Sequence, residues 1–98
     1  MKVAYAPRAA ADLIHIGEQS RRVFGAAVSA ALETYMRATI ARIAVMPEIG
    51  QRLPQRSEVR VVPLVRYPFK IFYTVAGETM TVLHIRHAAR RPWKVEEE

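Results

Sequence analysis

Apolar residues recur at intervals of three and four positions through the first half of this 98-residue chain. Residues 9–24 and residues 26–46 each carry such a stripe, and the spacing predicts two helices. Pro7 can open the first helix, because the N–H that proline lacks has no partner in a first helical turn. Gly25 separates the two helices, and Pro47 stops the second. A break this short predicts an antiparallel helical hairpin.

The second half of the chain alternates between apolar and other side chains, which is the pattern of β-strands. Residues 58–65, 69–75 and 79–86 predict three strands, and residues 76–78 predict a tight turn between the last two. Residues 2–6 have the character of one more strand. The order β-α-α-β-β-β predicts an α+β domain whose helical hairpin packs on one face of a small, mainly antiparallel sheet.

The length and composition indicate a single globular domain spanning residues 1–98. A chain of 98 residues leaves no room for a second core, and 51% of its residues are apolar. Residues 47–57 contain two prolines and a glycine and are expected to form a loop. The acidic residues 96–98 are expected to be a frayed, solvated tail.

The chain has no cysteine, which excludes a disulfide scaffold and a thiolate zinc site. Its start lacks the apolar core of a signal peptide, and no apolar run approaches the roughly 20 residues that span a membrane. We therefore expect a soluble, cytoplasmic protein without a membrane partner. The three histidines are scattered and match no ligand motif, so neither a metal nor another cofactor is expected.

The net charge of +6 favours polyanionic partners such as RNA, DNA or an acidic protein, although it also serves solubility. The positive charge is concentrated in the second half of the chain. Residues 56–94 carry eight lysines and arginines against two acids, whereas residues 1–55 carry seven against four. The strands and the segment after them are therefore the best candidates for an anion-binding surface.

Alternation along the predicted strands gathers cations on the face of the sheet that the helices leave open. These candidate target- or anion-binding residues are Arg60, Arg66, Lys70, His84 and Arg86. Pro63 and Pro68 can bulge the chain and shift the alternation, so the positions of Arg60 and Arg66 are less firmly placed than those of Lys70 and Arg86.

The same open face is expected to carry more apolar side chains than a surface left to water would. They are Val62, Leu64, Phe72, Met80 and Val82. Either a protein partner docks on this face, or the tail or a loop of the chain folds over it.

Guanidinium groups, an imidazole and an indole lie within eight residues near the end of the chain. They belong to Arg86, His87, Arg90, Arg91 and Trp93. Such a group would suit a phosphate backbone with a stacked base. The alternative is a basic tail in which Trp93 packs on the core.

Lys70 is the only lysine within the three strands predicted in the second half of the chain. It could stabilise charge that develops on a phosphate, or it could lie at the sheet margin with its ammonium in water. His84 and His87 could act as acid or base, although a strand histidine such as His84 can equally be a hydrogen-bonded structural residue.

The strand half contains no paired carboxylates that suggest glycosidase or metal-nuclease chemistry, and the sequence has neither a glycine-rich phosphate loop nor a nucleophile elbow. An enzyme built from these residues would therefore be metal-free and would rely on its cations. RNA suits such chemistry, because its 2′-OH is a built-in nucleophile.

Several stretches of the chain, taken together, carry a family resemblance. They are the opening strand with Pro7, the helical hairpin, PEIG at 47–50, RYPFKIFY at 66–73, HIRH at 84–87 and RRPW at 90–93. They cover essentially the whole chain, and they resemble the toxins of the RelE/ParE family, which belong to bacterial type II toxin–antitoxin pairs.

The resemblance implies the α+β fold that the alternation also predicts. It implies a cognate antitoxin whose C-terminal segment wraps and neutralises the toxin in a hetero-oligomer. Such a partner would cover the apolar residues expected on the open face. The family divides by activity: RelE-like members cleave mRNA on the ribosome, whereas ParE-like members poison DNA gyrase and are not catalysts.

For a RelE-like activity, the resemblance makes Lys70, Arg86, His87, Arg90 and Arg91 the catalytic residues. Lys70 falls where RelE-like members carry an arginine on the third strand, and Arg90 or Arg91 falls near their C-terminal arginine. Trp93 falls near their C-terminal tyrosine, but an indole N–H only donates a hydrogen bond and cannot act as acid or base. The HIRHxxRRPW ending is similar to ParE-like sequences, in which Trp93 would instead contact the target.

Overall fold

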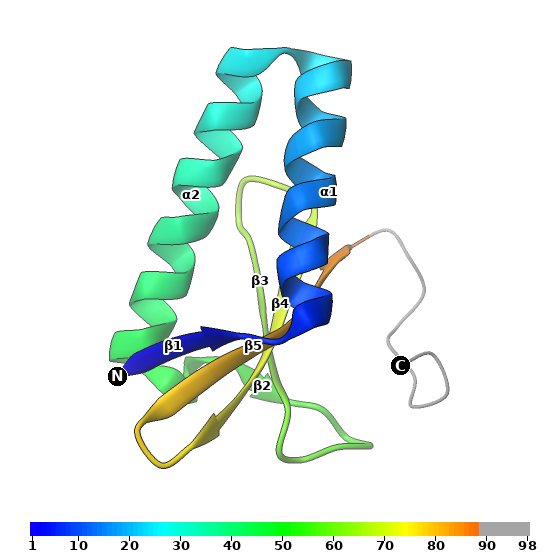
Figure 1. Ribbon diagram of the computed structural model, residues 1–98. Helices are drawn as coiled ribbons and strands as arrows, with labels where there is room; N and C mark the ends of the chain where they lie inside the picture. The colour runs from blue at the N-terminus through cyan, green and yellow to red at the C-terminus, as the bar shows by residue number, and fades with distance from the viewer. Residues whose placement is uncertain (89–98) are drawn as a thin grey trace.

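The computed structural model describes residues 1–88, and two helices stand as a hairpin on one face of a five-stranded sheet (Figure 1). The elements in chain order are β1 (Lys2–Tyr5), α1 (Pro7–Phe24), α2 (Ala26–Val45), the 3₁₀ turn η1 (Pro47–Ile49), β2 (Gln51–Arg52), β3 (Arg60–Pro63), β4 (Phe69–Ala76) and β5 (Thr79–His87). The predicted α+β fold is confirmed, including the helical hairpin and the mainly antiparallel sheet.

The helical hairpin begins and turns at the residues that the sequence indicates. Pro7 occupies the first turn of α1, two residues before the start predicted from the apolar stripe. Gly25 joins α1 to α2 with a φ of 93°, in the left-handed region that favours glycine. Just below this turn the Ser20 hydroxyl donates to the Ser29 hydroxyl at 3.0 Å, and this hydrogen bond ties the two helices together.

The strands lie in the spatial order β1-β5-β4-β3-β2. β1 pairs parallel with β5, and all other neighbours are antiparallel. The helical hairpin carries the chain from β1 at one edge of the sheet to β2 at the other. β2 was predicted as part of a loop, and that prediction is wrong. Its two residues pair with β3, but so short a strand leaves no alternation to detect.

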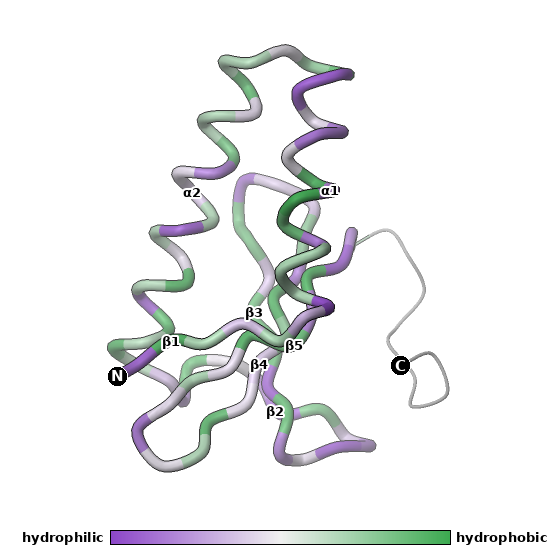
Figure 2. Tube along the Cα trace, viewed as in Figure 1, coloured by the Kyte–Doolittle hydropathy of each residue, from purple (hydrophilic) through white to green (hydrophobic). Residues whose placement is uncertain are grey.

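The core lies between the helices and the sheet face turned towards them. Figure 2 shows apolar residues along both helices and along the strands. The buried members of the core are Ala9, Leu32, Met36, Ile40, Ile43, Val62, Leu64, Ile71, Tyr73, Met80, Val82 and Ile85. The predicted orientation of β4 is confirmed, since Ile71 and Tyr73 belong to this core and Phe69 packs against it.

The prediction that Met80 and Val82 line the open face is wrong, because β5 contains a bulge. Tyr73 on β4 pairs with Val82, but Phe72 pairs with His84, so Leu83 has no residue opposite it. The extra residue reverses the alternation of β5. Met80 and Val82 consequently enter the helix-facing core, although they have the same sequence parity as His84.

The prediction that Val62 and Leu64 line the open face is also wrong. Val62 lies opposite Ile71, which places it on the helix side, and Leu64 is buried in the same core. Both alternating sets of β3 are rich in apolar residues, so the sequence pattern could not decide which set is buried. Of the five apolar residues expected on the open face, Phe72 lies outside the core cluster, yet only 5% of it is exposed.

Below α2, the chain is held to the sheet by the buried Tyr73 side chain. Its hydroxyl donates to the Pro47 carbonyl at 2.6 Å and accepts from the Gly50 N–H at 3.0 Å. Arg60 adds hydrogen bonds to the carbonyls of Glu48 and Gly50 at 3.1 and 2.7 Å. We call Tyr73, Arg60 and residues 47–50 the η1 clamp. Within residues 1–88, neither helix is long and apolar enough to cross a membrane.

Candidate functional site

The side of β4 and β5 that faces away from the helices carries two positive side chains and a histidine. Lys70 lies directly opposite Arg86 in the register of the two strands, and His84 follows on the same side, opposite Phe72. We call Lys70, His84 and Arg86 the basic face. Like charges opposite each other in a sheet repel, so Lys70 and Arg86 together favour an anion at this place.

His84 is the buried member of the basic face, with 5% of its surface exposed. Its ring lies 6.1 Å from that of Phe72, centroid to centroid, with 30° between the planes. Its Nδ1 lies 2.6 Å from a carboxylate oxygen of Asp12 on α1, and the same oxygen accepts the Ile85 N–H at 3.0 Å. A single acidic side chain therefore joins the first helix to β5.

The position of Asp12 follows from where β1 ends. The pairing of β1 with β5 stops at Tyr5 opposite Val82, and Ala6 donates to the Val82 carbonyl at 2.9 Å. Among residues 1–88, no strand lies beside this edge of β5 beyond that point. The Asp12 carboxylate takes the place of a strand partner and satisfies the Ile85 N–H.

The environment keeps the His84 imidazole neutral near pH 7. Burial lowers its pKa, the hydrogen bond and negative charge of Asp12 oppose this effect, and the positive charges of Arg8 and Arg86 add to it. In the neutral ring the Nδ1–H donates to Asp12, so the contact is a hydrogen bond to a carboxylate rather than an ion pair.

Sequence reasoning missed Asp12. It lies 72 residues before His84, and a carboxylate near the start of a helix is ordinarily explained by the helix dipole. Only the packing of α1 along β5 brings the two side chains together.

The other predicted cations lie apart from the basic face. Arg60 belongs to the η1 clamp on the helix side, so the prediction that it joins the open face is wrong. It pairs with Tyr73 in the register of β3 and β4, which sets its side. Arg66 is exposed in the loop between β3 and β4. The His87 ring meets Phe69 edge-on at 5.4 Å. Arg90, Arg91 and Trp93 lie outside the described residues.

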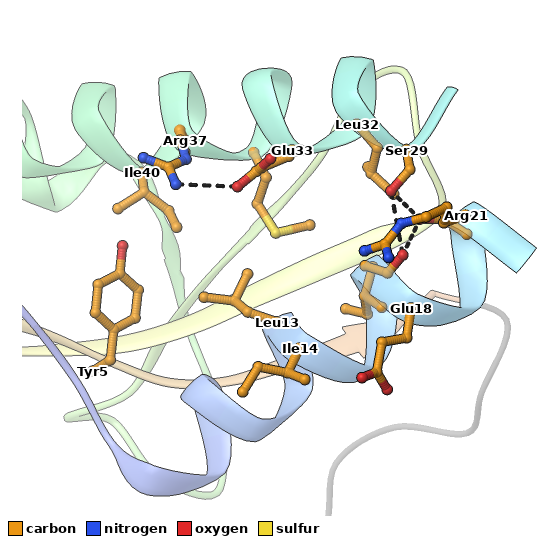
Figure 3. A pocket seen from close by; sticks show the side chains of 14 residues that line it. Tyr5, Leu13, Ile14, Glu18, Arg21, Ser29, Leu32, Glu33, Arg37 and Ile40 are labelled. Atoms are coloured by element: carbon orange, nitrogen blue, oxygen red, sulfur yellow. Dashed lines mark hydrogen bonds and ion pairs between the residues drawn. The ribbon is translucent and has the colours of Figure 1, made fainter. Parts of the chain in front are cut away.

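A groove between the two helices is a second candidate site, which the sequence did not indicate. It has a volume of about 580 Å³, and Tyr5, Leu13 and Ile40 point into it (Figure 3). Leu32 and Met36 of α2 also line it, and charged residues stand at its rim: Glu18 and Arg21 on α1, and the Glu33–Arg37 ion pair on α2. An apolar groove with such a rim is the kind of surface that receives an amphipathic helix.

Among residues 1–88, no group of three or more His, Asp or Glu side chains is arranged to hold a metal ion. What the site offers chemically is therefore a cationic surface and one histidine oriented by a carboxylate.

A family model matches almost the whole of the chain. The model of the ParE toxin of the type II toxin–antitoxin system parDE matches residues 3–92. The chain therefore belongs to the ParE toxins of type II toxin–antitoxin systems, within the RelE/ParE family that its sequence resembles. No curated protein matches the chain.

Solved structures of toxin–antitoxin proteins have the same fold. The chromosomal ParDE system from P. aeruginosa is similar with a TM-score of 0.77 and 23% identity, over 89% of this chain and 95% of that chain. The isolated E. coli RelE toxin is similar with a TM-score of 0.61 and 16% identity, over 91% and 85%. The intact E. coli RelBE toxin–antitoxin complex is similar with the same TM-score and identity, over 91% of this chain and 98% of that chain.

Proposed function

We propose that this chain is a ParE-like toxin that arrests bacterial growth by poisoning DNA gyrase, and that it acts by binding rather than by catalysis. The match of the ParE toxin model to residues 3–92 carries this proposal. The site is consistent with it. His84, the best-oriented acid–base group among the described residues, is almost fully buried and bonded to Asp12, which suits a structural role better than proton transfer to a substrate.

The charge distribution supports a target that contains nucleic acid. Gyrase at work is a protein–DNA complex, and a protein of net charge +6 is attracted to the DNA part of it. Lys70 and Arg86 lie opposite each other on the side of the sheet that the helices do not cover.

Supercoiling by purified gyrase tests the proposal. We expect the purified chain to inhibit supercoiling of relaxed plasmid DNA or to trap cleavage complexes. Lys70→Glu should weaken the effect, whereas Arg42→Glu, a matched charge reversal on the helical layer, should not. Full supercoiling at stoichiometric excess of the chain would overturn the proposal.

We propose further that a cognate antitoxin neutralises the chain by seating an amphipathic helix in the groove between α1 and α2. The groove is apolar at its base, and beside it 63% of the Ile14 surface is exposed. This replaces four of the contacts expected from the sequence, since Val62, Leu64, Met80 and Val82 are buried in the core. Phe72 lies on the opposite side and is itself only 5% exposed, so it too offers little surface to a partner.

Co-purification with the antitoxin encoded beside the toxin tests the groove. Ile14→Asp should release the antitoxin, and Val45→Asp, a change at a similarly exposed valine away from the groove, should not. Equal retention by both variants would contradict this binding site.

One observation favours a second candidate, a RelE-like endonuclease that cleaves mRNA on the ribosome. Lys70 and Arg86 lie directly opposite each other on the side of the sheet that the helices leave open, and paired cations of this kind can stabilise the charge that develops on a phosphate. In this case Lys70, Arg86, His87, Arg90 and Arg91 would be the catalytic residues. Primer extension after induction would then show cuts at the ribosomal A site that vanish with Arg90→Ala plus Arg91→Ala. Intact transcripts during full growth arrest would exclude this activity.

A further inference from the structure

The loop between β3 and β4, residues 64–68, holds an aliphatic side chain out into water. Val65 is 85% exposed, more than any other large apolar residue in the part of the chain that the structure describes. Its neighbour Arg66 is exposed as well. A single exposed valine is ordinary on a protein surface, so the loop is of interest only if other features distinguish it.

The first such feature is that the loop is held in one shape. Pro63 and Pro68 restrict the backbone at its two ends, and the Leu64 N–H donates to the Phe69 carbonyl at 2.9 Å. The Tyr67 ring packs edge-on against Tyr35 of α2, 5.5 Å between centroids. Because both ends are anchored, Val65 and Arg66 are presented without the entropic cost of ordering a free loop.

The second feature is the charge around the loop. Arg66 lies at the tip, and Lys70 follows at the start of β4, where it is exposed opposite Arg86. No acidic residue occurs from residue 59 to residue 77. Two exposed cations, Arg66 and Lys70, therefore follow the exposed valine within five residues of the chain.

We propose that the loop of residues 64–68 binds duplex DNA, with Arg66 and Lys70 on the phosphates and Val65 packed in a groove. This inference rests on the proposed function, because it identifies the surface through which the toxin would meet the DNA of its target. Aliphatic side chains flanked by cations serve as wedges at the base steps of duplex DNA. The phosphate contacts supply most of the affinity, and the apolar contact fixes the position.

Other partners fit the loop less well. Single-stranded RNA is bound by stacking on aromatic rings, but here Tyr67 is engaged with Tyr35 and Phe69 with His87. An acidic protein surface would require a larger apolar anchor, commonly a tryptophan or tyrosine, than one valine supplies.

Fluorescence anisotropy with a short, labelled DNA duplex of mixed sequence tests this inference on the full chain. Arg66→Ala should weaken binding roughly three- to tenfold and reduce the salt dependence by about one phosphate contact. Val65→Ser should weaken binding by a similar factor without changing the salt dependence. Arg22→Ala and Val45→Ser are the matched controls, since both residues are exposed on the helices, and they should bind as the unchanged chain does.

Three results would overturn the inference. They are no binding to the duplex, equal binding by the loop variants and the controls, or tighter binding to single-stranded RNA of the same length. Gyrase inhibition that persists in Val65→Ser and Arg66→Ala would refute the proposed role of the loop, but it would not contradict the proposed function. The opposite result is also possible: the chain binds duplex DNA through these residues but does not inhibit gyrase. That result would refute the proposed function and support DNA binding by the loop.

Discussion

Two polar connections hold the first half of this protein to its sheet, and they are built on different chemistry. The η1 clamp at the end of α2 pairs the neutral Tyr73 hydroxyl with backbone groups of Pro47 and Gly50. The contact of Asp12 with His84 uses a carboxylate and a titratable ring. The first depends on close packing and holds at any physiological pH, whereas the second depends on charge. A toxin that must fold and be neutralised can therefore be weakened independently at these two places.

The largest effect is expected from Gly50→Ala in the η1 clamp. A Cβ at this position would lie 2.6 Å from the Tyr73 hydroxyl oxygen and 2.9 Å from its ring. The ring is fully buried and cannot move aside, so we expect a loss of about 3 kcal/mol in the free energy of unfolding. Urea denaturation measures it. The control is Gly17→Ala in α1, where a Cβ meets no atom within 4 Å and should stabilise the helix by about 1 kcal/mol.

Tyr73→Phe removes the hydroxyl of the same clamp without adding bulk. The Gly50 N–H and the Pro47 carbonyl would lose their partner, and we expect a loss of about 2 kcal/mol. The burial that raises the pKa of Tyr73 keeps this hydroxyl protonated and able to donate. A change below about 0.5 kcal/mol would mean that water replaces the hydroxyl, and that the clamp depends on shape alone.

Asp12→Ala breaks the second connection, and its expected cost is about 2 kcal/mol because His84 and the Ile85 N–H lose a charged acceptor. Asp12→Asn keeps an acceptor and should cost less. Glu33→Ala, which breaks an exposed ion pair with Arg37, should cost no more than about 0.5 kcal/mol. Equal losses of thermal stability in Asp12→Ala and Glu33→Ala would show that the buried contact stabilises the fold no more than an exposed ion pair does.

The pH dependence of stability separates the two connections. Because the pKa of His84 is lower in the folded than in the unfolded chain, acid adds protons preferentially to the unfolded state. Its contribution is complete above the unfolded pKa of roughly 6.5 and is lost as the pH falls through the folded value. The loss cannot exceed about 1.4 kcal/mol per pH unit. Unfolding curves measured at several pH values give this dependence. The free energy of unfolding should vary less with pH in His84→Gln than in the unchanged chain, and His15→Gln is the exposed control.

The smallest effect is expected on the basic face. Lys70→Thr removes a like charge opposite Arg86 and should stabilise the chain by about 0.5 kcal/mol. The same change should reduce growth inhibition, because it removes a cation from the proposed target surface. A variant that loses both stability and toxicity would show instead that Lys70 acts through the fold.

The sequence predicted the layers of this protein well where one side of an element is clearly apolar. In β4 the alternation of Phe69, Ile71 and Tyr73 with Lys70 and Phe72 identified the buried face correctly. In β3 both sides are apolar, and the prediction for Val62 failed. The strength of the pattern, rather than the length of the strand, decided the result.

Two features that shape the candidate site, a bulge and a side-chain contact, could not be derived from the pattern of the sequence. The bulge beside Val82 depends on how β5 meets β4, and one extra residue exchanges the faces of every side chain on one side of it. The meeting of Asp12 with His84 depends on the path of α1 along a strand edge that β1 leaves uncovered. Neither is a local property of the residues involved.

The sequence by itself determined the order of the long elements, the helical hairpin and the positive charge of the strand half, because these follow from local spacing and composition. The resemblance of its motifs to known toxins indicated the family. Only the tertiary structure decided which side chains of β5 face the helices, which acid holds His84, and that a groove lies between α1 and α2. These features depend on strand register and layer packing, which bring together residues far apart in the chain.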